Sequence, residues 1–504
     1  MPGPGCTERA CRRGTGRPPP GPPPSVPCPT APPHEASPPG GALFVCTFRA
    51  PAHNAPAMKT IQKPENRIWN PEMECMSRGD MSALQLARLQ KIVRTAWDRQ
   101  PFYRAKMEAA GAHPDQIKTL DDIRRLPFTT KDDLRGCFPY KGFAVPMEDI
   151  VRVHASSGTT GQATVVGYTR GDLDRWSECM ARLQTAAGVT PRDIVQIVMG
   201  YGFFTGGLGH HYGIEKLGAT VLPVSAGKSE RQIRIMCDYR TTVLIATPSY
   251  ALRLAELAAQ MGVADKLHLR VALFGSESWG EEMRRQLQQN IGVFATDNYG
   301  LSEVQGPGVS YECVEQNGMH IAEDHFLPEL IDSKTCERAS DPFGAGGELV
   351  ITTLTKEGIP VIRYRTRDLC HFMEGPCPCG RTGLRMSKVS ARSDDMLIIR
   401  GVNVFPQQIE KALLSVPGTA PHYQIVVSRP GAMDELEVQV EATVELFADQ
   451  MRKQQDVIRQ IQEKLQNDVL VRAKIRLVEP GSLPRFEGKA SRVKDLRKAP
   501  AEAK

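Results

Sequence analysis

The chain has 504 residues, 41% of them hydrophobic and 24% charged, which is the composition of an ordinary globular protein with several domains. Its formal net charge of +6 is too small to indicate nucleic-acid binding, and 6% aromatic residues provide little surface for stacking bases. No segment approaches the roughly 18 to 20 consecutive apolar residues that a membrane-spanning helix needs. We therefore expect neither nucleic acid nor a membrane among its partners.

The first 57 residues form a segment of their own, because they hold 16 of the 39 prolines. Such a segment buries too little apolar surface to offset the entropy lost on ordering, so we expect it to be disordered. Ala42–Val45 is too short for the apolar core of a secretory signal, and the prolines oppose the amphipathic helix of a transit peptide. We interpret the segment as an upstream false start with Met58 as the first residue, which a mass spectrum of the native N-terminus would test.

Thirteen cysteines are spread irregularly along the chain, and four of them lie in the proline-rich head. A chain of this length folds without disulfides, and no compact, even cysteine framework is present. The cysteine usage therefore predicts reduced thiols and a cytoplasmic location.

Residues 58–393 are predicted to form a large α/β domain. Up to about residue 150 the apolar residues follow helical spacing, and from residue 190 short β-branched runs alternate with helical stretches. The runs begin near Ile194, Thr220, Val243 and Arg270. A strand followed by a helix every 23 to 27 residues is typical of a parallel sheet, so we expect mostly parallel sheets. Further strands are predicted at Gly347–Thr353, Val361–Tyr364 and Met396–Arg400.

Residues 394–504 are predicted to form a smaller α+β domain. The pattern of Gln407–Leu414 is helical, and strand patterns follow at Tyr423–Ser428, Glu435–Ala442 and Lys474–Val478. A longer helix is expected between the last two strands. Its apolar face would consist of Met451, Ile458, Ile461, Leu465 and Val469.

The first segment that indicates chemistry consists only of hydroxyl residues and glycines: Ser156, Ser157, Gly158, Thr159, Thr160 and Gly161. Backbone N–H groups at close approach, together with hydroxyl donors, are what the oxygens of a polyphosphate require. The segment is not a Walker loop, because no Gly-Lys-Ser/Thr follows. The alternative is an ordinary hairpin turn between Val151–His154 and Val165–Tyr168.

Four further segments are weak indicators alone, since an arginine followed by an aspartate is usually a surface pair and a lysine near a chain end is usually solvated. They are Tyr299–Glu303, Tyr364–Asp368, the stretch from Arg392 to Glu410, and Phe486–Ala490. In this order, and together with residues 156–161, they resemble the adenylate-forming superfamily of acyl- and aryl-coenzyme A synthetases, luciferases and peptide-synthetase adenylation domains. The resemblance to the phenylacetate–coenzyme A ligases extends from about residue 60 to residue 500, and it rests on Thr205–Gly209, Tyr299–Gly308, Glu323–Phe326 and Ser393–Pro406.

This resemblance implies the adenylate-forming fold and a reaction in two halves, in which a carboxylate attacks the α-phosphorus of ATP and coenzyme A then displaces AMP. Residues 156–161 would hold the β- and γ-phosphates, and Glu303 would hold Mg²⁺. Tyr299 would pack against adenine, Asp368 would accept the ribose hydroxyls, and Arg392 would lie near ribose and phosphate. The chain departs from the family pattern at Gln162-Ala163, where Lys-Pro is usual, and at Ala391, where glycine is usual.

The resemblance further implies that Lys489 is a mobile catalytic cation, which reaches the substrate carboxylate and the developing bridging oxygen. In the superfamily the small C-terminal domain rotates between the two half-reactions, so we expect residues 394–504 to be mobile as a body. Asp394 matches the hinge position. Gly401 matches the position that lines the tunnel for the pantetheine arm of coenzyme A.

The pocket for the acid is expected around Tyr201, Phe203, Phe204 and Gly206, with Gly275 and Ser276 as a further wall. Aromatic walls separated by small residues suit a flat aryl ring better than an alkyl chain. Ordinary core packing at a strand end is the alternative for any one of these residues. An apolar pocket discriminates by only about 1–3 kcal/mol per methylene, so the sequence does not separate phenylacetate from indoleacetate, hydroxyphenylacetate or benzoate.

A possible metal site involves Cys377 and Cys379, which lie two residues apart, and the earlier pair Cys313 and His320. Three thiolates and one imidazole are a closed tetrahedral set typical of structural zinc, and some members of the ligase family are similar in this respect. Cys370 and His371 are competing ligands, although their nearness to Asp368 favours packing beside the nucleotide. The alternative is a group of inert thiols.

We predict from these residues and this resemblance an ATP-dependent ligase that joins an aryl acid, phenylacetate or a close arylacetate, to coenzyme A. The first alternative is an adenylation-only relative that loads a carrier protein or adenylates a deazaflavin cofactor, and coenzyme A dependence separates the two. The second alternative is a non-catalytic nucleotide-binding or zinc-stabilised scaffold, which has no need for Glu303, Asp368, Asp394 and Lys489 together. The family resemblance also implies a homodimer.

Overall fold

The structure is a computed structural model that describes residues 61–156, 162–400, 402–429, 434–449, 451–486 and 491–497. Several sequence-based expectations lie outside these ranges: the proline-rich head and residues Ser157, Gly158, Thr159, Thr160, Gly161, Gly401 and Lys489.

Helices dominate the N-terminal part, as the apolar spacing predicts. They are α1 (Pro71–Glu74), α2 (Arg78–Arg99), α3 (Pro101–Ala109) and α4 (Lys131–Gly136), with short 3₁₀ turns at Pro114–Gln116, Leu120–Arg125 and Met147–Asp149. The long helix α2 begins where the Ser77 side chain accepts a hydrogen bond from the backbone N–H of Asp80. It ends before Pro101, which starts α3 as its first residue. The buried face of α2 carries Leu89 and Val93, which are fully buried.

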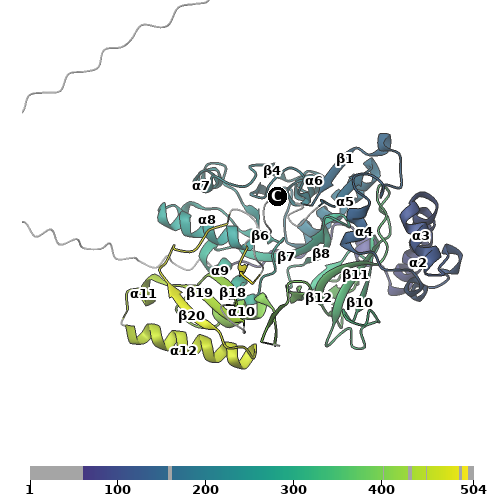
Figure 1. Cartoon of the computed structure of the whole chain (residues 1–504). Helices are drawn as coiled ribbons and strands as arrows, with labels where there is room; N and C mark the ends of the chain where they lie inside the picture. The colour runs from purple at the N-terminus through teal and green to yellow at the C-terminus, as the bar shows by residue number, and fades with distance from the viewer. Residues whose placement is uncertain are drawn as a thin grey trace, which may run out of the picture. The chain divides into compact units, whose positions relative to one another are not determined.

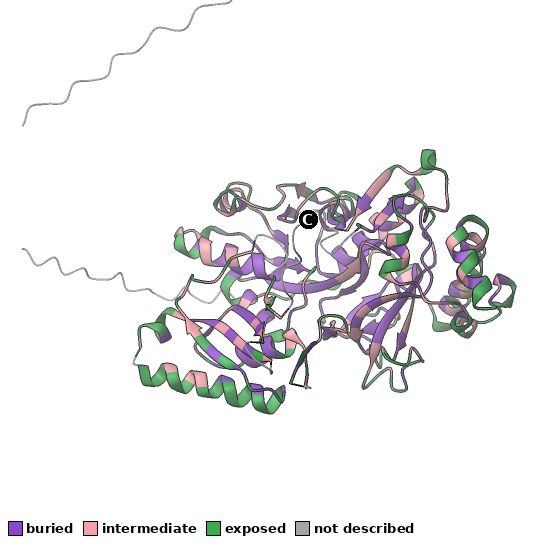
Figure 2. Ribbon diagram, viewed as in Figure 1, coloured by how far each residue is buried: buried purple, intermediate pink, exposed green. Residues whose placement is uncertain are grey.

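Among the described residues, the largest sheet has nine strands in the order β13-β14-β9-β8-β7-β6-β5-β3-β4. Its parallel part consists of β3 (Ile194–Ile197), β4 (Thr220–Leu222), β5 (Val243–Ala246), β6 (Val271–Phe274) and β7 (Phe294–Leu301). The crossover helices are α6 (Thr205–Leu217), α7 (Ser229–Asp238), α8 (Pro248–Gln260) and α9 (Glu281–Ile291), while α5 (Arg170–Ala186) precedes β3 (Figure 1). Every residue of β5 and β6 is buried (Figure 2), because helices cover both faces of a parallel sheet.

The remainder of this sheet is antiparallel, so the expected parallel arrangement holds only from β3 to β7. Its strands are β8 (Gly306–Glu312), β9 (Met319–Ile321), β13 (Phe372–Met373) and β14 (Arg385–Met386). A second antiparallel sheet contains β10 (Phe326–Ile331), β11 (Gly347–Thr353), β12 (Tyr364–Cys370) and β15 (Ala391–Arg392). The strands β1 (Arg152–Ala155) and β2 (Val165–Tyr168) form an antiparallel pair on either side of residues 156–161.

The predicted strand at Val361–Tyr364 is wrong, because β12 begins only at Tyr364. The backbone N–H groups of Val361, Ile362 and Arg363 donate to the hydroxyls of Thr353, Tyr103 and Thr352. Side-chain oxygens therefore replace the strand-to-strand ladder that an apolar run of this kind usually joins.

The C-terminal part has a sheet and a core of its own. Its sheet order is β20-β19-β18-β21, formed by β18 (Thr419–Ser428), β19 (Glu435–Ala442), β20 (Lys474–Val478) and β21 (Val493–Asp495). Helices α10 (Pro406–Leu414), α11 (Val444–Phe447) and α12 (Met451–Asp468) accompany it, preceded by the hairpin of β16 (Leu397–Ile399) and β17 (Val402–Val404). In Figure 1, α12 runs along the sheet at the yellow end of the chain.

The inner face of α12 carries Ile461 and Leu465, which are fully buried against Ile425 and Val438 of the sheet. Figure 2 shows that most of α12 is exposed. Met451 was expected on the apolar face, but its side chain is 76% exposed because it lies at the first turn, beyond the edge of the core. No helix in the described ranges combines the length and apolar character needed to cross a membrane.

Candidate functional site

Three residues that are far apart in the sequence form one hydrogen-bonded network at the end of β7. The hydroxyl of Tyr299 donates to one carboxylate oxygen of Asp368 at 2.6 Å, and the Arg392 guanidinium donates to the other at 2.7 Å. Strand pairing brings this about, since Asp368 of β12 lies directly opposite Arg392 of β15. Burial, together with the Asp368 carboxylate, raises the pKa of Tyr299, which keeps the phenol protonated as a donor.

The same guanidinium also holds the expected hinge residue. The Nε and Nη2 atoms of Arg392 donate to the two carboxylate oxygens of Asp394 at 3.0 and 3.1 Å. Burial disfavours the charge of Arg392, but the carboxylates of Asp368 and Asp394 outweigh it and raise the pKa of the guanidinium. One fully charged side chain therefore connects the buried Asp368 to the half-exposed Asp394.

Glu303 is buried, and its carboxylate lies 3.2 Å from the ammonium of Lys131, the first residue of α4. No sequence motif marks Lys131, because a lysine in the first turn of a short helix carries no signal of its own. Glu303 belongs to the same neighbourhood as the network above. Burial and the charge of Glu303 raise the pKa of the Tyr364 phenol, the charge of Asp368 adds to this rise, and the charge of Arg392 opposes it. Tyr364 is therefore close enough to all three charges to be influenced by each.

Of the hydroxyl and glycine segment 156–161, only Ser156 is described. Its N–H donates to the carbonyl of Thr164 at 2.9 Å, and its hydroxyl accepts from the N–H of Thr164 at 3.0 Å. The pairing of β1 and β2 therefore extends to Ser156 and Thr164.

Three contacts connect the expected acid pocket to these segments. The carbonyl of Phe203 accepts from the N–H of Ala155 at 3.2 Å and contacts the Nδ1 atom of His154 at 3.0 Å. The hydroxyls of Thr205 and Ser302 are 3.0 Å apart. The loop between β3 and α6 thus lies beside both residue 156 and the Tyr299–Glu303 segment.

The residues expected to line the acid pocket differ in their exposure. Tyr201 is half-buried, whereas Phe203 and Phe204 are 69% and 46% exposed. A Cβ atom at Gly206 would lie 2.5 Å from the Phe204 ring, so only glycine allows that ring its position. A Cβ atom at Gly275 would lie 2.9 Å from the Asn298 carbonyl, so the backbone that follows β6 and leads to Ser276 lies against β7.

A stack of aromatic rings that no sequence motif indicates supports this region. The rings of Tyr168 and Trp176 are stacked at 5.2 Å, and His154 contacts both edge-on. The Trp176 indole fills the space beside Gly209 and Gly306. A Cβ atom would lie 2.6 Å from the indole if it were added at Gly209, and 2.5 Å from it if it were added at Gly306. These glycines follow the two expected ligand-binding segments, so Trp176 packs under both of them.

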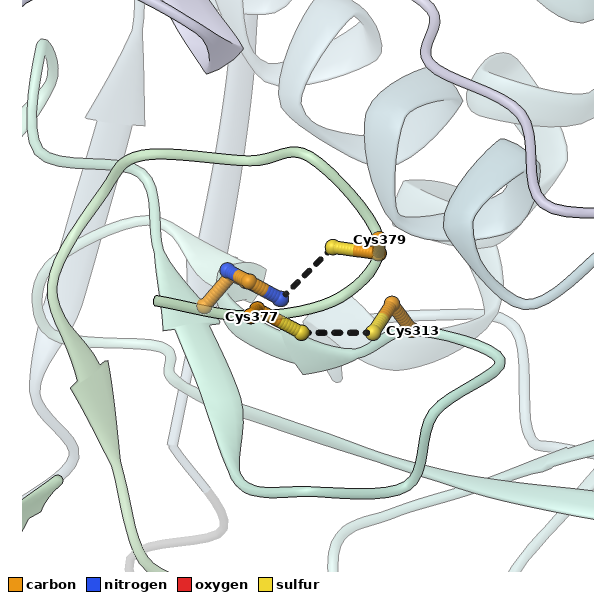
Figure 3. Close-up of side chains that lie close together, drawn as sticks. Cys313, Cys377 and Cys379 are labelled. Atoms are coloured by element: carbon orange, nitrogen blue, oxygen red, sulfur yellow. Dashed lines mark hydrogen bonds between the residues drawn. The ribbon is translucent and has the colours of Figure 1, made fainter. Parts of the chain in front are cut away.

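The four expected metal ligands converge in the structure. The ligand atoms of Cys313, His320, Cys377 and Cys379 all lie within 4.8 Å of one another and all four residues are buried. The thiols of Cys313 and Cys377 face each other (Figure 3). Their sulfur atoms are 3.7 Å apart, and the Cys379 thiol lies 3.4 Å from the Nε2 atom of His320. A tetrahedron with metal–sulfur bonds of about 2.3 Å and metal–nitrogen bonds of about 2.0–2.1 Å has edges of about 3.8 Å between sulfurs and about 3.5 Å between sulfur and nitrogen. The Cys313–Cys377 and Cys379–His320 separations match such edges, and the other pairs of ligand atoms lie within 4.8 Å.

The N-terminal segment before α2 is tied to the loop that carries Cys379. The Asn66 amide donates to the carbonyl of Cys379 at 2.8 Å, and the Arg381 guanidinium donates to the carbonyl of Arg67 and to the carboxylate of Glu74. We call residues 66–76 the N-terminal strap. The side chains of Glu74 and Arg381 are both almost completely buried, so this ion pair is shielded from solvent.

A buried carboxyl group lies two residues before Tyr299 on β7. Burial raises the pKa of Asp297 to about 7; the cation Lys388 opposes this shift and the carboxylate of Glu312 adds to it. The folded protein therefore binds a proton that the unfolded chain releases near pH 4, so ionisation of Asp297 lowers the free energy of unfolding as the pH rises from about 4 to about 7.

The variant Asp297→Asn removes this titration. Relative to the wild type, its free energy of unfolding should rise with pH over that interval, by up to about 1.4 kcal/mol per pH unit. Urea unfolding at pH 5 and pH 8 measures the difference. Asp98→Asn, at an exposed aspartate, is the control. A difference between wild type and Asp297→Asn that does not change with pH would contradict the assignment.

The chain is similar in sequence and in structure to known proteins that bind AMP and form coenzyme A thioesters. Residues 81–353 match the family described as AMP-binding enzyme, and residues 401–497 match the AMP-binding enzyme C-terminal domain. The chain is 47% identical over 428 residues to phenylacetate-coenzyme A ligase of Escherichia coli, covering 84% of this chain and 97% of that protein. It is 47% identical over 446 residues to phenylacetate-coenzyme A ligase of Thermus thermophilus, covering 86% of this chain and 100% of that protein. The crystal structure of 2-hydroxyisobutyryl-CoA ligase in the postadenylation state superimposes with a TM-score of 0.80 at 30% identity, covering 86% of this chain and 94% of that one.

Proposed function

The chain belongs to the AMP-binding enzyme family, within its phenylacetate–coenzyme A ligases, and from this premise we propose that it joins an aryl acid to coenzyme A with ATP as the energy source. The acid is phenylacetate or a close arylacetate. The reaction passes through an acyl-adenylate and releases AMP and pyrophosphate. The observation that carries the proposal is that Tyr299, Asp368 and Arg392 meet from three separate segments, with Glu303 four residues after Tyr299.

The first half-reaction brings two anions together, so the site must supply positive charge and hydrogen-bond donors. A carboxylate oxygen of the acid attacks the α-phosphorus, and the bond to the pyrophosphate oxygen breaks. We assign the ribose hydroxyls to Asp368, whose carboxylate Tyr299 and Arg392 hold in a fixed orientation. Residues 156–161 would donate to the β- and γ-phosphates, and Lys489 would approach the attacking carboxylate.

Lys131 supplies a positive charge that the family's phosphate loop has but this chain lacks at Gln162. Its ammonium lies beside Glu303, within the region that Ser302 and Thr205 connect to the loop after β3. Mg²⁺, when bound, would neutralise phosphate charge, and Glu303 is the carboxylate that we propose holds it.

In the second half-reaction the thiol of coenzyme A attacks the acyl carbon and AMP leaves. We propose that residues 394–504 rotate about Asp394 as a separate domain from 58–393, which exchanges Lys489 for the segment of Gly401. The separate core of the C-terminal part supports this division. Arg392, bound to Asp394 by two hydrogen bonds, stands at the start of the hinge.

The acid pocket is proposed at Tyr201, Phe203, Phe204, Gly206, Gly275 and Ser276. The hydrogen bond between Ala155 and Phe203 supports this position, because an acid held there would lie beside the phosphate-binding segment. The exposure of Phe203 and Phe204 leaves two aromatic rings available to cover an aryl ring.

Pyrophosphate release with ATP, Mg²⁺ and a panel of aryl acids, with and without coenzyme A, tests this function. We expect release that depends on the acid, with AMP and an aryl thioester accumulating only when coenzyme A is present. Adenylate formation that coenzyme A never converts to thioester would favour the adenylation-only alternative. A protein that binds ATP without turning over any acid would favour the non-catalytic scaffold.

Zinc bound by Cys313, His320, Cys377 and Cys379 is proposed as a structural clip, because all four positions of a tetrahedron are taken by protein.

Removing one ligand with Cys377→Ser should lower the bound zinc to well under one equivalent. The melting temperature should fall by several degrees, since metal binding contributes directly to folding. Chelator-released zinc measured with a chromophoric indicator, together with a melting curve, provides the two readouts. Cys237→Ser, a cysteine outside the cluster, is the matched control. Full zinc content in Cys377→Ser would contradict the site.

Two further expectations are carried as proposals. A cytoplasmic location rests on the irregular cysteine usage of the sequence, and a homodimer rests on the family alone. Fractionation of cells and light scattering of the purified protein test them separately.

A further inference from the structure

A chain of three polar side chains leads from the proposed acid pocket to the surface of α6. The hydroxyl of Tyr201 lies 3.2 Å from the Nδ1 atom of His211, and the Nε2 atom of His211 lies 3.1 Å from the Glu215 carboxylate. His211 and Glu215 are four residues apart on one helix face, so α6 presents both to Tyr201. The side chain of His211 is 19% exposed and that of Glu215 is 52% exposed.

The chemistry of the three groups sets the direction of these hydrogen bonds. The Glu215 carboxylate only accepts, so the Nε2 atom of His211 carries the proton. In the neutral imidazole the Nδ1 atom is then an acceptor, and the Tyr201 hydroxyl donates to it. Burial and the negative charge of Glu215 raise the pKa of Tyr201, which keeps this hydroxyl protonated.

The Tyr201 ring also packs against α6 and the hydrophobic core beside it. Tyr201 follows β3 in the loop before α6, and its ring contacts the helix where a Cβ atom at Gly207 would lie 3.5 Å from it. The same Cβ atom would lie 2.8 Å from the carbonyl of Gly200, so the glycine permits the close approach of the loop to α6. The planes of the Tyr201 and His211 rings are perpendicular, with centroids 5.9 Å apart.

We propose that His211 and Glu215 are positioning residues for the acid substrate, acting through Tyr201. They hold the phenol ring in one position as a wall of the pocket, and the Tyr201 hydroxyl donates its proton in a hydrogen bond to His211. The Tyr201 oxygen can then accept a hydrogen bond but not donate one to a substituent that reaches it. The site therefore takes aryl acids whose ring is unsubstituted or carries a hydrogen-bond donor, such as a hydroxyl group, in preference to rings with an acceptor of similar size, such as fluorine.

This inference rests on the proposed function, and steady-state kinetics of Tyr201→Phe, His211→Leu and the double variant test it. Either single change should raise the KM for phenylacetate about threefold to tenfold, the effect of one lost neutral hydrogen bond. The kcat and the KM for ATP should change less than twofold. The double variant should be no worse than the single ones, because the two residues act as one unit. The preference for hydroxylated over fluorinated acids should disappear in His211→Leu.

Glu215→Gln is the conservative control and Tyr212→Phe is the matched control, while Glu215→Leu extends the test to the third residue. Glu215→Gln keeps an acceptor for the Nε2 proton and should behave as the wild type, whereas Glu215→Leu should shift the KM for the acid in the direction of His211→Leu. Tyr212→Phe removes a phenol hydroxyl from the same helix but keeps the ring, over which the Arg152 guanidinium lies. This variant should leave the kinetics unchanged. An unchanged KM for the acid in both single variants, additive effects in the double variant, or an equal rise in the KM for ATP would each overturn the inference. Wild-type protein that forms no aryl thioester would instead refute the proposed function.

Discussion

Replacing Glu303 with glutamine is expected to lower the kcat for adenylation by about 10²–10³-fold at saturating ATP, the usual effect of removing one group that stabilises transition-state charge. Glutamine keeps the size of the side chain but loses the charge proposed to hold Mg²⁺. Folding should be little affected, because the partner Lys131 is half-exposed and its charge is solvated when the pair is broken. Pyrophosphate release measured over a range of Mg²⁺ concentrations should show both a lower maximum and a higher Mg²⁺ requirement.

The control for this change is Glu337→Gln, which removes the charge of an exposed glutamate and should have no effect on either quantity. Lys131→Met distinguishes the two members of the pair. We expect it to raise the KM for ATP, because it removes a cation from the phosphate region, without raising the Mg²⁺ requirement. Wild-type kcat in Glu303→Gln would remove Glu303 from the mechanism.

Replacing Lys489 with alanine is expected to separate the two half-reactions. Adenylation should slow by about 10²–10³-fold, because the lysine is proposed to neutralise charge that develops during attack on the α-phosphorus. Thioester formation from a preformed aryl-adenylate and coenzyme A should change less than threefold, since a different segment, that of Gly401, is proposed to occupy the site in that step. Single-turnover measurements of each half-reaction provide the test.

Lys494 of β21 provides the matched control, because it is an exposed lysine five residues further along the same segment. Lys494→Ala should leave both half-reactions unchanged. If Lys489→Ala retained full adenylation, the proposed mechanism would be wrong even if the protein were a ligase.

The sequence predicted regular elements well where local pattern determines structure. The bounds of β11, β19 and β20 are those of the predicted strands, because alternating or continuous apolar residues between polar turns leave few other conformations. Val361 and Ile362 have the same apolar character but lie outside β12. Their hydrogen-bond partners, Thr353 and Tyr103, are distant in the sequence and therefore invisible to a local pattern.

The same reason explains what was missed in the candidate site. Tyr299, Asp368 and Arg392 were recognised from short motifs, but their mutual contacts depend on the pairing of β12 with β15. Lys131 lies 172 residues before Glu303, and no motif surrounds it. The aromatic support formed by Tyr168 and Trp176 depends on how α5 packs against β2, which only the tertiary structure reveals.

The N-terminal strap has a consequence for how the protein is made. Asn66 and Cys379 are separated by 313 residues, and the ion pair between Glu74 and Arg381 by 307. A ribosome adds about 5–20 residues per second, so the strap emerges about 15 to 60 s before the loop that receives it. During that interval the Glu74 carboxylate lacks its Arg381 partner, and the strap has only the contacts made by residues synthesised earlier, such as those of Trp69 and Asn70 with Glu178. Closure over the cysteine loop is thus among the last events in the synthesis of the large domain, and a chain interrupted before residue 381 would leave this end open to proteases.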